Sequence, residues 1–409
     1  MDEAELVVVA EVAETGPQGG RVRVTETLSG GPCPEALSVH SPPYHRALAV
    51  GWAPLAPGDR VVLFLKGAGD QFVVVADGLG SMKLPEGEEA AEVDGIRRTI
   101  AILGLDEDAR NRAMLAAVTD ANPRLRAEAA AYVVSGLRRT YPHDKYWKEL
   151  SALLDAPDAE TRITALRAMR NMQLPQAVPK LLKLTVDPDA KVARDAVETV
   201  GKYRSPEVLA RLLQLADSPD WQMRYVVLWH FYGDERKEAI EAATRMLSDP
   251  DGRVRRQAPR PFGYWLRKGM ALEAIPKLVS LLGDNEPGVG SAAADVFGFS
   301  GRQEAVEALL EVLRREKPAA QSYGLATVAL EHLYSGGEEP IHRRIAAERA
   351  LIVEALNSGS AQAPHAAAWI LGHMDDPAAT AALRDAARNH ADPEVRELAA
   401  KLLKEPAEH

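Results

Sequence analysis

Hydrophobic residues follow two different patterns along the chain, and the change falls near residue 90. Before that point, short β-rich runs are separated by Gly and Pro clusters, which is typical of strands joined by turns. From Val93 to the end the pattern becomes helical and rich in Ala, Leu and Arg. The chain is therefore expected to be an α+β protein in which a small antiparallel β-barrel precedes a long helical region. The strands are expected at residues 4–12, 20–28, 35–41, 60–66 and 71–77.

The helical region repeats with a step of 31 residues, and four prolines, each followed by Asp, mark that step. With each proline counted as position zero, position eight is small or apolar and position twelve is apolar. Proline fixes the first helical turn, and the Asp beside it accepts from free backbone N–H groups. A Gly at position thirteen is expected to end the helix. The prolines are Pro157, Pro188, Pro219 and Pro250; position eight holds Ala165, Ala196, Val227 and Ala258; position twelve holds Met169, Val200, Phe231 and Phe262; position thirteen holds Gly201 and Gly263, and Gly298 and Gly372 in further copies that start at Asn285 and Gly359 without the proline.

A second apolar helix is expected after each of these helices. Each pair forms an amphipathic hairpin that cannot bury its apolar face alone, so stacking of the hairpins supplies the core. The second helices are expected at residues 177–186, 207–216, 238–247, 274–282 and 305–313.

The run DPDAKVARDAVETVGKYRSPEVLARLLQL, residues 187–215, resembles the short form of the HEAT repeat. That form is also found in phycobilisome lyases and in many bacterial scaffold proteins. The resemblance covers residues 119–405 with about eight units, and it implies a right-handed α-solenoid that binds other molecules. It does not imply lyase activity, because a fold alone does not carry chemistry.

The β region, through its runs 4–12, 22–30, 55–65 and 73–80, resembles the netrin or tissue-inhibitor-of-metalloproteinase-like variant of the OB-fold in bacterial exported proteins. We therefore expect a barrel at 1–84, a linker with capping helices at 85–118 and the solenoid at 119–405. The resemblance implies a periplasmic or exported protein if a leader peptide has been removed, and otherwise a cytoplasmic one.

Composition narrows the classes of partner. The formal charge of −10 gives no general attraction to nucleic acid or anionic lipid. No window approaches the 18 apolar residues of a membrane helix, so no membrane insertion is expected. Residues 1–90 carry thirteen acids against six bases, whereas residues 249–269 carry a net charge of +4, confined mainly to one repeat. This confinement argues against a nucleic-acid partner. The oligomeric state is left open.

Aromatic residues gather in the middle repeats, where eight of the 22 lie between Trp221 and Trp265. Tyr225 and Trp229 occupy positions six and ten, which are polar or charged in most copies, so both are expected on an exposed helix face. Pro259 and Pro261 are expected to kink or shorten their helix, leaving a protruding loop. The candidate partner-binding residues are Tyr225, Trp229, Tyr232, Tyr264 and Trp265 with Arg224, Arg256 and Arg260.

Two alternatives stand beside this patch. The aromatic side chains of the patch could instead cover the kink or pack on the β domain. Phe231 and Phe262 are assigned to the core. Arginine at position five is expected to cap or bridge neighbouring hairpins rather than to bind a partner. That position holds Arg162, Arg224, Arg255 and Arg396.

No catalytic or metal motif emerges, and we expect no cofactor. Cys33, His40 and His45 match no established metal-site spacing, and one cysteine excludes an internal disulfide. The leading hypothesis is a non-enzymatic scaffold that binds a protein or peptide. The alternatives are a ligand-modifying or lyase-like enzyme subunit and a nucleic-acid-binding solenoid.

Overall fold

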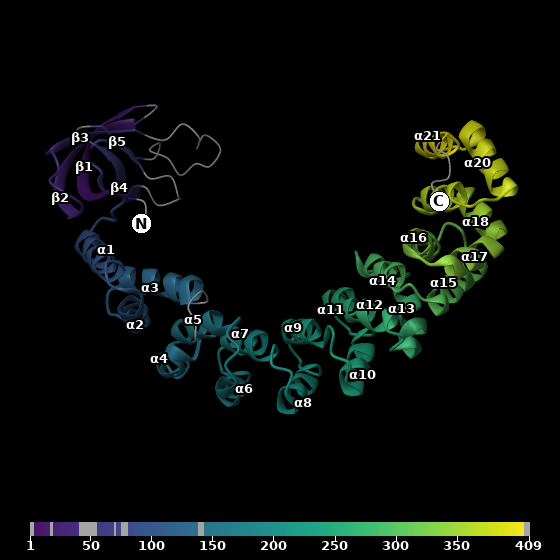
Figure 1. The fold of residues 1–409 in the computed structure, drawn as a ribbon, viewed down its shortest axis with the longest axis horizontal. Coiled ribbons are helices and arrows are strands. Elements are labelled where there is room, and N and C mark those ends of the chain that lie inside the picture. The colour runs from purple at the N-terminus through teal and green to yellow at the C-terminus, as the bar shows by residue number, and fades with distance from the viewer. Residues whose placement is uncertain are drawn as a thin grey trace. The chain divides into compact units, whose positions relative to one another are not determined.

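The computed structural model describes residues 4–16, 19–40, 55–68, 71–74, 81–137 and 143–404. The chain divides into two compact units, Met1–Ala177 and Val178–His409. The first contains a β-barrel followed by helices, and the second is helical throughout its described residues (Figure 1).

Five strands of the first unit close into a barrel in the order β1-β2-β3-β5-β4, and β4 pairs back with β1. A sixth short strand, which the sequence did not predict, pairs with Val61–Leu63 of β4, beyond the part of β4 that pairs with β5. All pairings are antiparallel except that of β3 with β5, which is parallel. A ring of five strands cannot alternate in direction throughout, so closing it requires a parallel pair. The strands are β1 (Leu6–Gly16), β2 (Gly19–Ser29), β3 (Ala36–His40), β4 (Arg60–Ala68), β5 (Gln71–Val74) and β6 (Ser81–Lys83).

The apolar runs of β1 and β4 are continuous because both faces of these strands are buried. One face, including Val8 and Leu63, fills the barrel interior. The other face, including Val9 and Phe64, packs with α1 (Glu89–Leu103) through residues such as Ile96. The helix that follows the barrel therefore shields its outer surface.

The helices of the first unit continue from this contact, with α1 packing on α3 and α3 on α5. The segment expected to link and cap, 85–118, holds α1 and α2. The remaining helices of this unit are α2 (Glu107–Ala117), α3 (Pro123–Gly136), α4 (Trp147–Leu153) and α5 (Ala159–Met169), with 3-10 turns at His143–Tyr146 and Pro175–Ala177.

The second unit stacks helices in two rows. The inner row is α7, α9, α11 with α12, α14, α16, α19 and α21, each packing on the next, and the outer row carries the other helices (Figure 1). The inner helices are α7 (Ala190–Val200), α9 (Trp221–Phe231), α11 (Gly252–Gln257), α12 (Arg260–Arg267), α14 (Val289–Gly298), α16 (Gln321–Gly336), α19 (Ala363–Gly372) and α21 (Pro393–Leu402). The outer helices are α6 (Val178–Leu184), α8 (Pro206–Leu215), α10 (Lys237–Met246), α13 (Ile275–Leu281), α15 (Gln303–Arg315), α17 (Glu339–Ala347), α18 (Arg349–Leu356) and α20 (Pro377–Asn389), with a 3-10 turn at Leu272–Ala274.

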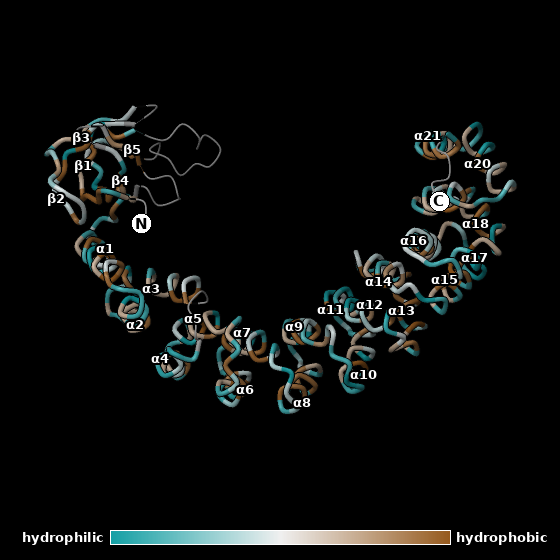
Figure 2. The backbone as a smooth tube through the Cα atoms, in the orientation of Figure 1, coloured by the Kyte–Doolittle hydropathy of each residue, from teal (hydrophilic) through white to brown (hydrophobic). Residues whose placement is uncertain are grey.

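The residues of the repeat have the capping and core roles that were predicted for them. The Asp after each marker proline caps its helix, as where Asp189 accepts from the N–H groups of Lys191 and Val192. All residues predicted at positions eight and twelve of the four proline-marked repeats are buried. Hydrophobic and hydrophilic stretches alternate along the helices, as hairpins buried on one side require (Figure 2).

Arginine at position five caps and bridges the hairpins, as predicted. Arg224 donates to the carbonyl oxygens of Ser218 and Pro219 in the preceding turn, at 2.7 and 3.2 Å. It also forms two hydrogen bonds of 2.7 Å to the Asp249 carboxylate in the turn before the next inner helix. Arg255 forms the corresponding pair with Asp284. Arg162 and Arg396 likewise donate to the turn before their helices.

Helices α7, α14 and α19 end at the glycine of position thirteen, as predicted, but backbone freedom is not the reason for glycine there. Gly201 has an ordinary helical φ of −62°, so it is not there to provide a left-handed turn. A Cβ on Gly201 would lie 2.4 Å from Cγ of His230, and one on Gly298 would lie 2.6 Å from Cβ of His332. Gly201 and Gly298 therefore let the next inner helix approach closely.

Candidate functional site

The proline pair breaks the inner row in the middle of the second unit, as predicted. The helix that starts after Asp251 ends at Gln257, and α12 begins at Arg260, with Pro259 and Pro261 at the junction. Gly263 does not end this helix, because α12 continues to Arg267. Residues 264–267, expected in a protruding loop, are therefore helical.

The prediction that Trp265 protrudes is wrong. Its side chain is 0% exposed, and its indole N–H donates to the backbone oxygen of Asp234 at 2.8 Å. Its ring packs edge-on against Phe262, with 5.0 Å between centroids. Once α12 continues past Gly263, Trp265 lies three residues after Phe262 and so shares its buried face. The assignment of Phe231 and Phe262 to the core is confirmed.

Other aromatic residues of the predicted patch do lie at the surface. Trp229 is 46% exposed and Tyr232 is 48% exposed. The Arg260 guanidinium lies over the Trp229 ring, 4.2 Å from its centroid, and the rings of Tyr232 and Tyr264 are 5.9 Å apart. Helices α9 and α12 thus present an aromatic and cationic surface on the inner row.

Tyr225 and Tyr264 are each held by neighbours. Tyr225 is half-buried, and its ring meets Trp221 edge-on at 6.4 Å. The Tyr264 hydroxyl donates to Oε1 of Glu235 at 2.6 Å, and Lys268 pairs with the same carboxylate. This shared contact lowers the pKa of Glu235 and raises that of Lys268.

The arginines of the predicted patch divide into two kinds. Arg224 is committed to Asp249, and hydrogen bonding to that carboxylate raises the pKa of the guanidinium. These hydrogen bonds support the prediction that Arg224 bridges neighbouring hairpins, and they occupy its guanidinium group. Arg256 and Arg260 are exposed and form no ion pair with any residue in the described part of the chain.

A groove of about 550 Å³ lies between α9, the α11–α12 pair and α14; we call it the central groove. Four of the predicted residues line it, namely Tyr232, Arg256, Arg260 and Tyr264. It is also lined by Gln257, Arg267, Asp295 and Phe299, which were not predicted from the sequence. Phe299 is 69% exposed. An aromatic residue directly after the helix-terminal Gly298 was the signal that could have identified it.

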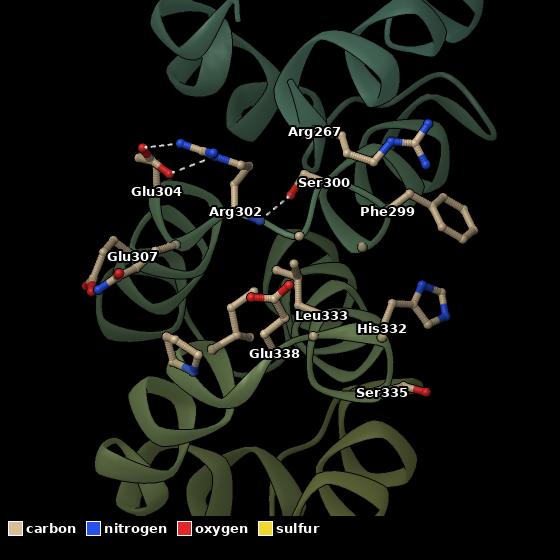
Figure 3. Close-up of a pocket in the computed structure, with 17 residues that line it drawn as sticks. Arg267, Phe299, Ser300, Arg302, Glu304, Glu307, His332, Leu333, Ser335 and Glu338 are labelled. Carbon is tan, nitrogen blue, oxygen red and sulfur yellow. Dashed lines mark hydrogen bonds and ion pairs between the residues drawn. The ribbon is translucent and has the colours of Figure 1, made fainter. Parts of the chain in front are cut away.

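A second groove of about 1120 Å³ adjoins the central groove and shares Arg267 and Phe299 with it (Figure 3). His332 stacks on Phe299 with 6.3 Å between ring centroids. Away from these rings, Arg302 is paired with Glu304, and Glu307 with Arg344. Arg302, Glu304 and Glu307 of this second groove are thus neutralised within the protein.

The described residues contain no group of three or more His, Cys, Asp or Glu side chains arranged to hold a metal ion. His45, weighed above as a metal ligand, lies outside the described residues. Within the same described segments, no helix has the length and apolar character needed to cross a bilayer.

The two-row stack of helical hairpins and the inner-face groove define an α-solenoid. A family model for HEAT repeats matches residues 148–231, 240–322 and 339–408, more than half of the chain. The chain therefore belongs to the HEAT-repeat family. No match to the chain is found among curated protein sequences.

Solved structures of importin-β share this fold. Importin-β in an ammonium sulfate condition matches with a TM-score of 0.56 and 13% identity, over 78% of this chain and 49% of that one. Yeast importin-β (Kap95p) matches with a TM-score of 0.55 and 13% identity, over 76% and 47%. A complex of Kap95 with Nup1 matches with a TM-score of 0.55 and 12% identity, over 76% and 46%. The chain thus spans about half the length of these proteins, and the likeness concerns the fold.

Proposed function

We propose that this protein is a non-enzymatic scaffold or adaptor whose central groove holds a protein or peptide partner. The observation that carries the proposal is the exposure of Tyr232 and Phe299 in one groove, with the exposed Trp229 ring beside it under Arg260. Large apolar side chains exposed together mark interaction sites on soluble proteins, and Tyr, Trp and Arg dominate the energetics of protein interfaces. Protein binding is also what the Kap95 complex with Nup1 shows for a protein of this fold.

Affinity capture tests this proposal. The full chain and a Trp229→Ala/Phe299→Ala variant are used as baits, and co-purified proteins are quantified by mass spectrometry. Val186→Ala provides a matched control, because Val186 is also strongly exposed but follows outer helix α6. We expect a protein that the wild type and the control recover equally and that the double variant loses. Equal recovery by all three baits would contradict the assignment of the site.

We also propose that the barrel is OB-like and related to the netrin-type domain of exported bacterial proteins. The support is its strand order, in which five strands close through the β1–β4 pair, as expected for a small Greek-key barrel. Fractionation of the native cells, with the protein located by immunoblot, tests whether it is exported. Recovery from the cytoplasm alone would count against an exported protein.

A further inference from the structure

Arginines around the central groove mostly hold carboxylates. Arg224 binds Asp249, Arg255 binds Asp284, and Arg253 binds Asp251. Three others, Arg256, Arg260 and Arg267, line the groove, and none of them forms a hydrogen bond or ion pair with another described residue. Asp295 is the single carboxylate among the described residues that line the groove. The groove thus has three positive charges against one negative charge, within a chain whose formal net charge is −10.

Gln257 gives a second, independent indication that the groove binds a ligand. Its side chain lines the same groove yet is only 8% exposed. Its buried amide nitrogen has no hydrogen-bond partner within the described structure. A buried donor without an acceptor is costly, and such groups in native structures call for an explanation. A carbonyl or carboxylate oxygen in the groove would supply the acceptor after a rotation of the amide.

Arg260 is oriented for recognition of a carboxylate. Its guanidinium face lies on the Trp229 ring at 4.2 Å, and stacking of this kind leaves the N–H edge available. The guanidinium edge matches a carboxylate with two parallel hydrogen bonds. The exposed Phe299 ring and the Tyr232–Tyr264 pair offer apolar contacts at the same groove.

We propose that the central groove binds an acidic peptide segment that carries an aromatic or aliphatic side chain beside its carboxylates. Arg256, Arg260 and Arg267 bind the carboxylates, Phe299 contacts the apolar side chain, and Gln257 donates to an oxygen of the peptide. This inference rests on the proposed function, since it specifies the chemistry of the partner that the scaffold holds.

A peptide fits these observations better than a nucleic acid does. A polynucleotide presents phosphates at regular short intervals and needs basic residues along its whole path. On the described inner helices of the second unit, arginines without an ion-pair or hydrogen-bond partner lie only around this groove. In the adjoining groove, Arg302 is paired with Glu304, and Glu307 with Arg344. A polyanion that left the groove in this direction would find no unpaired arginine on the described helices α14, α16 and α19.

Selection from a random dodecapeptide library displayed on phage tests the inference with the full chain as bait. We expect the enriched peptides to combine an excess of Asp and Glu with an aromatic or aliphatic residue. A labelled peptide from the selection is then measured by fluorescence anisotropy against Arg256→Ala/Arg260→Ala. Loss of two charge-assisted contacts is expected to weaken binding by at least about tenfold. Arg245→Ala, an exposed arginine on outer helix α10, is expected to bind as the wild type does.

The outcomes separate this inference from the proposed function. Enriched peptides without an acidic excess, or acidic peptides that bind the arginine variant equally well, would overturn the inference. If such peptides still lost affinity on Trp229→Ala/Phe299→Ala, the scaffold function would stand. Displacement of the peptide by an equimolar single-stranded 20-nucleotide DNA would favour a nucleic-acid ligand and overturn the inference. Enrichment of no peptide at all would overturn both proposals.

Discussion

Adjacent arginines in one repeat have opposite roles. Arg255 points toward the next repeat, where it holds the Asp284 carboxylate at 2.7 and 2.9 Å, and it also donates to two carbonyls of the preceding turn. Arg256 is exposed and lines the central groove. Successive residues of an α-helix point about 100° apart, so neighbouring side chains serve the stack and the groove separately. The two residues are chemically identical, and only their positions within the repeat distinguish the role of Arg255 from that of Arg256.

Stability measurements on these two residues are expected to differ sharply. Arg255→Ala leaves Asp284 mostly buried without its cation and two carbonyls without a donor, so we expect a loss of about 2–4 kcal/mol in the free energy of unfolding. Arg256→Ala removes an exposed side chain and is expected to change it by less than about 0.5 kcal/mol. Urea denaturation followed by circular dichroism measures both. Equal losses in the two variants would refute the division of roles.

His230 is expected to make stability depend on pH. Burial, with Lys202 and Arg204 nearby, lowers the pKa of His230 to about 4, whereas the unfolded chain has a pKa of about 6.5. Between these pKa values the unfolded state binds more protons than the folded state. The contribution of neutral His230 to the free energy of unfolding is therefore complete above about pH 6.5 and is lost as the pH falls towards 4. The slope is at most about 1.4 kcal/mol per pH unit. Denaturation of His230→Gln from pH 7 to 4.5 should show a shallower slope than the wild type; parallel slopes would contradict the assignment.

At the scale of helices, glycine marks where inner helices meet. Gly298 leaves no room for a methyl group, because a Cβ there would lie 2.6 Å from Cβ of His332. Gly263 holds the same repeat position, but nothing lies within 4 Å of its would-be Cβ. The insertion of a second short helix at Pro259 separates α12 from the regular contact.

The two glycines therefore predict opposite effects of the same substitution. Gly298→Ala forces two helices apart and is expected to cost about 1–3 kcal/mol of the free energy of unfolding. Gly263→Ala fills open space in a helix with ordinary backbone angles and is expected to add about 0.5–1 kcal/mol. Parallel urea titrations of both variants check this. Destabilisation of similar size in both would show that glycine acts through the backbone alone.

The regular repeats could be predicted from sequence because each position has a fixed environment. Caps, core positions and outer helices recur every 31 residues. The break at the two prolines follows from the proline ring, which clashes with the preceding helical turn. The course of the chain after the break could not be predicted, since the register of Trp265 depends on whether α12 continues past Gly263. The groove residues Gln257, Arg267 and Phe299 come from separate helices, and only packing between repeats brings them together. The parallel β3–β5 pair depends on closure of the barrel.

Charge at the scale of the whole molecule bears on the choice of partner. The chain has 59 acidic against 49 basic residues, and many arginines of the solenoid are held by carboxylates in the next turn or repeat. We expect no retardation of labelled 20-nucleotide single- or double-stranded DNA or RNA in a gel at 150 mM salt with micromolar protein. Retardation that weakened steeply with added salt would indicate phosphate contacts and contradict the account.

The central claim is that the inner row of a HEAT solenoid presents a protein-binding groove around α9, α12 and α14. Photo-crosslinking tests it most directly. Benzoylphenylalanine replaces Tyr232, an exposed aromatic residue of the groove, or, as a control, the exposed Val186 on the outer side. Irradiation in native extract is expected to yield a covalent protein adduct from position 232 that is absent from position 186. Adducts at position 186 alone, or at both positions in equal yield, would contradict the claim.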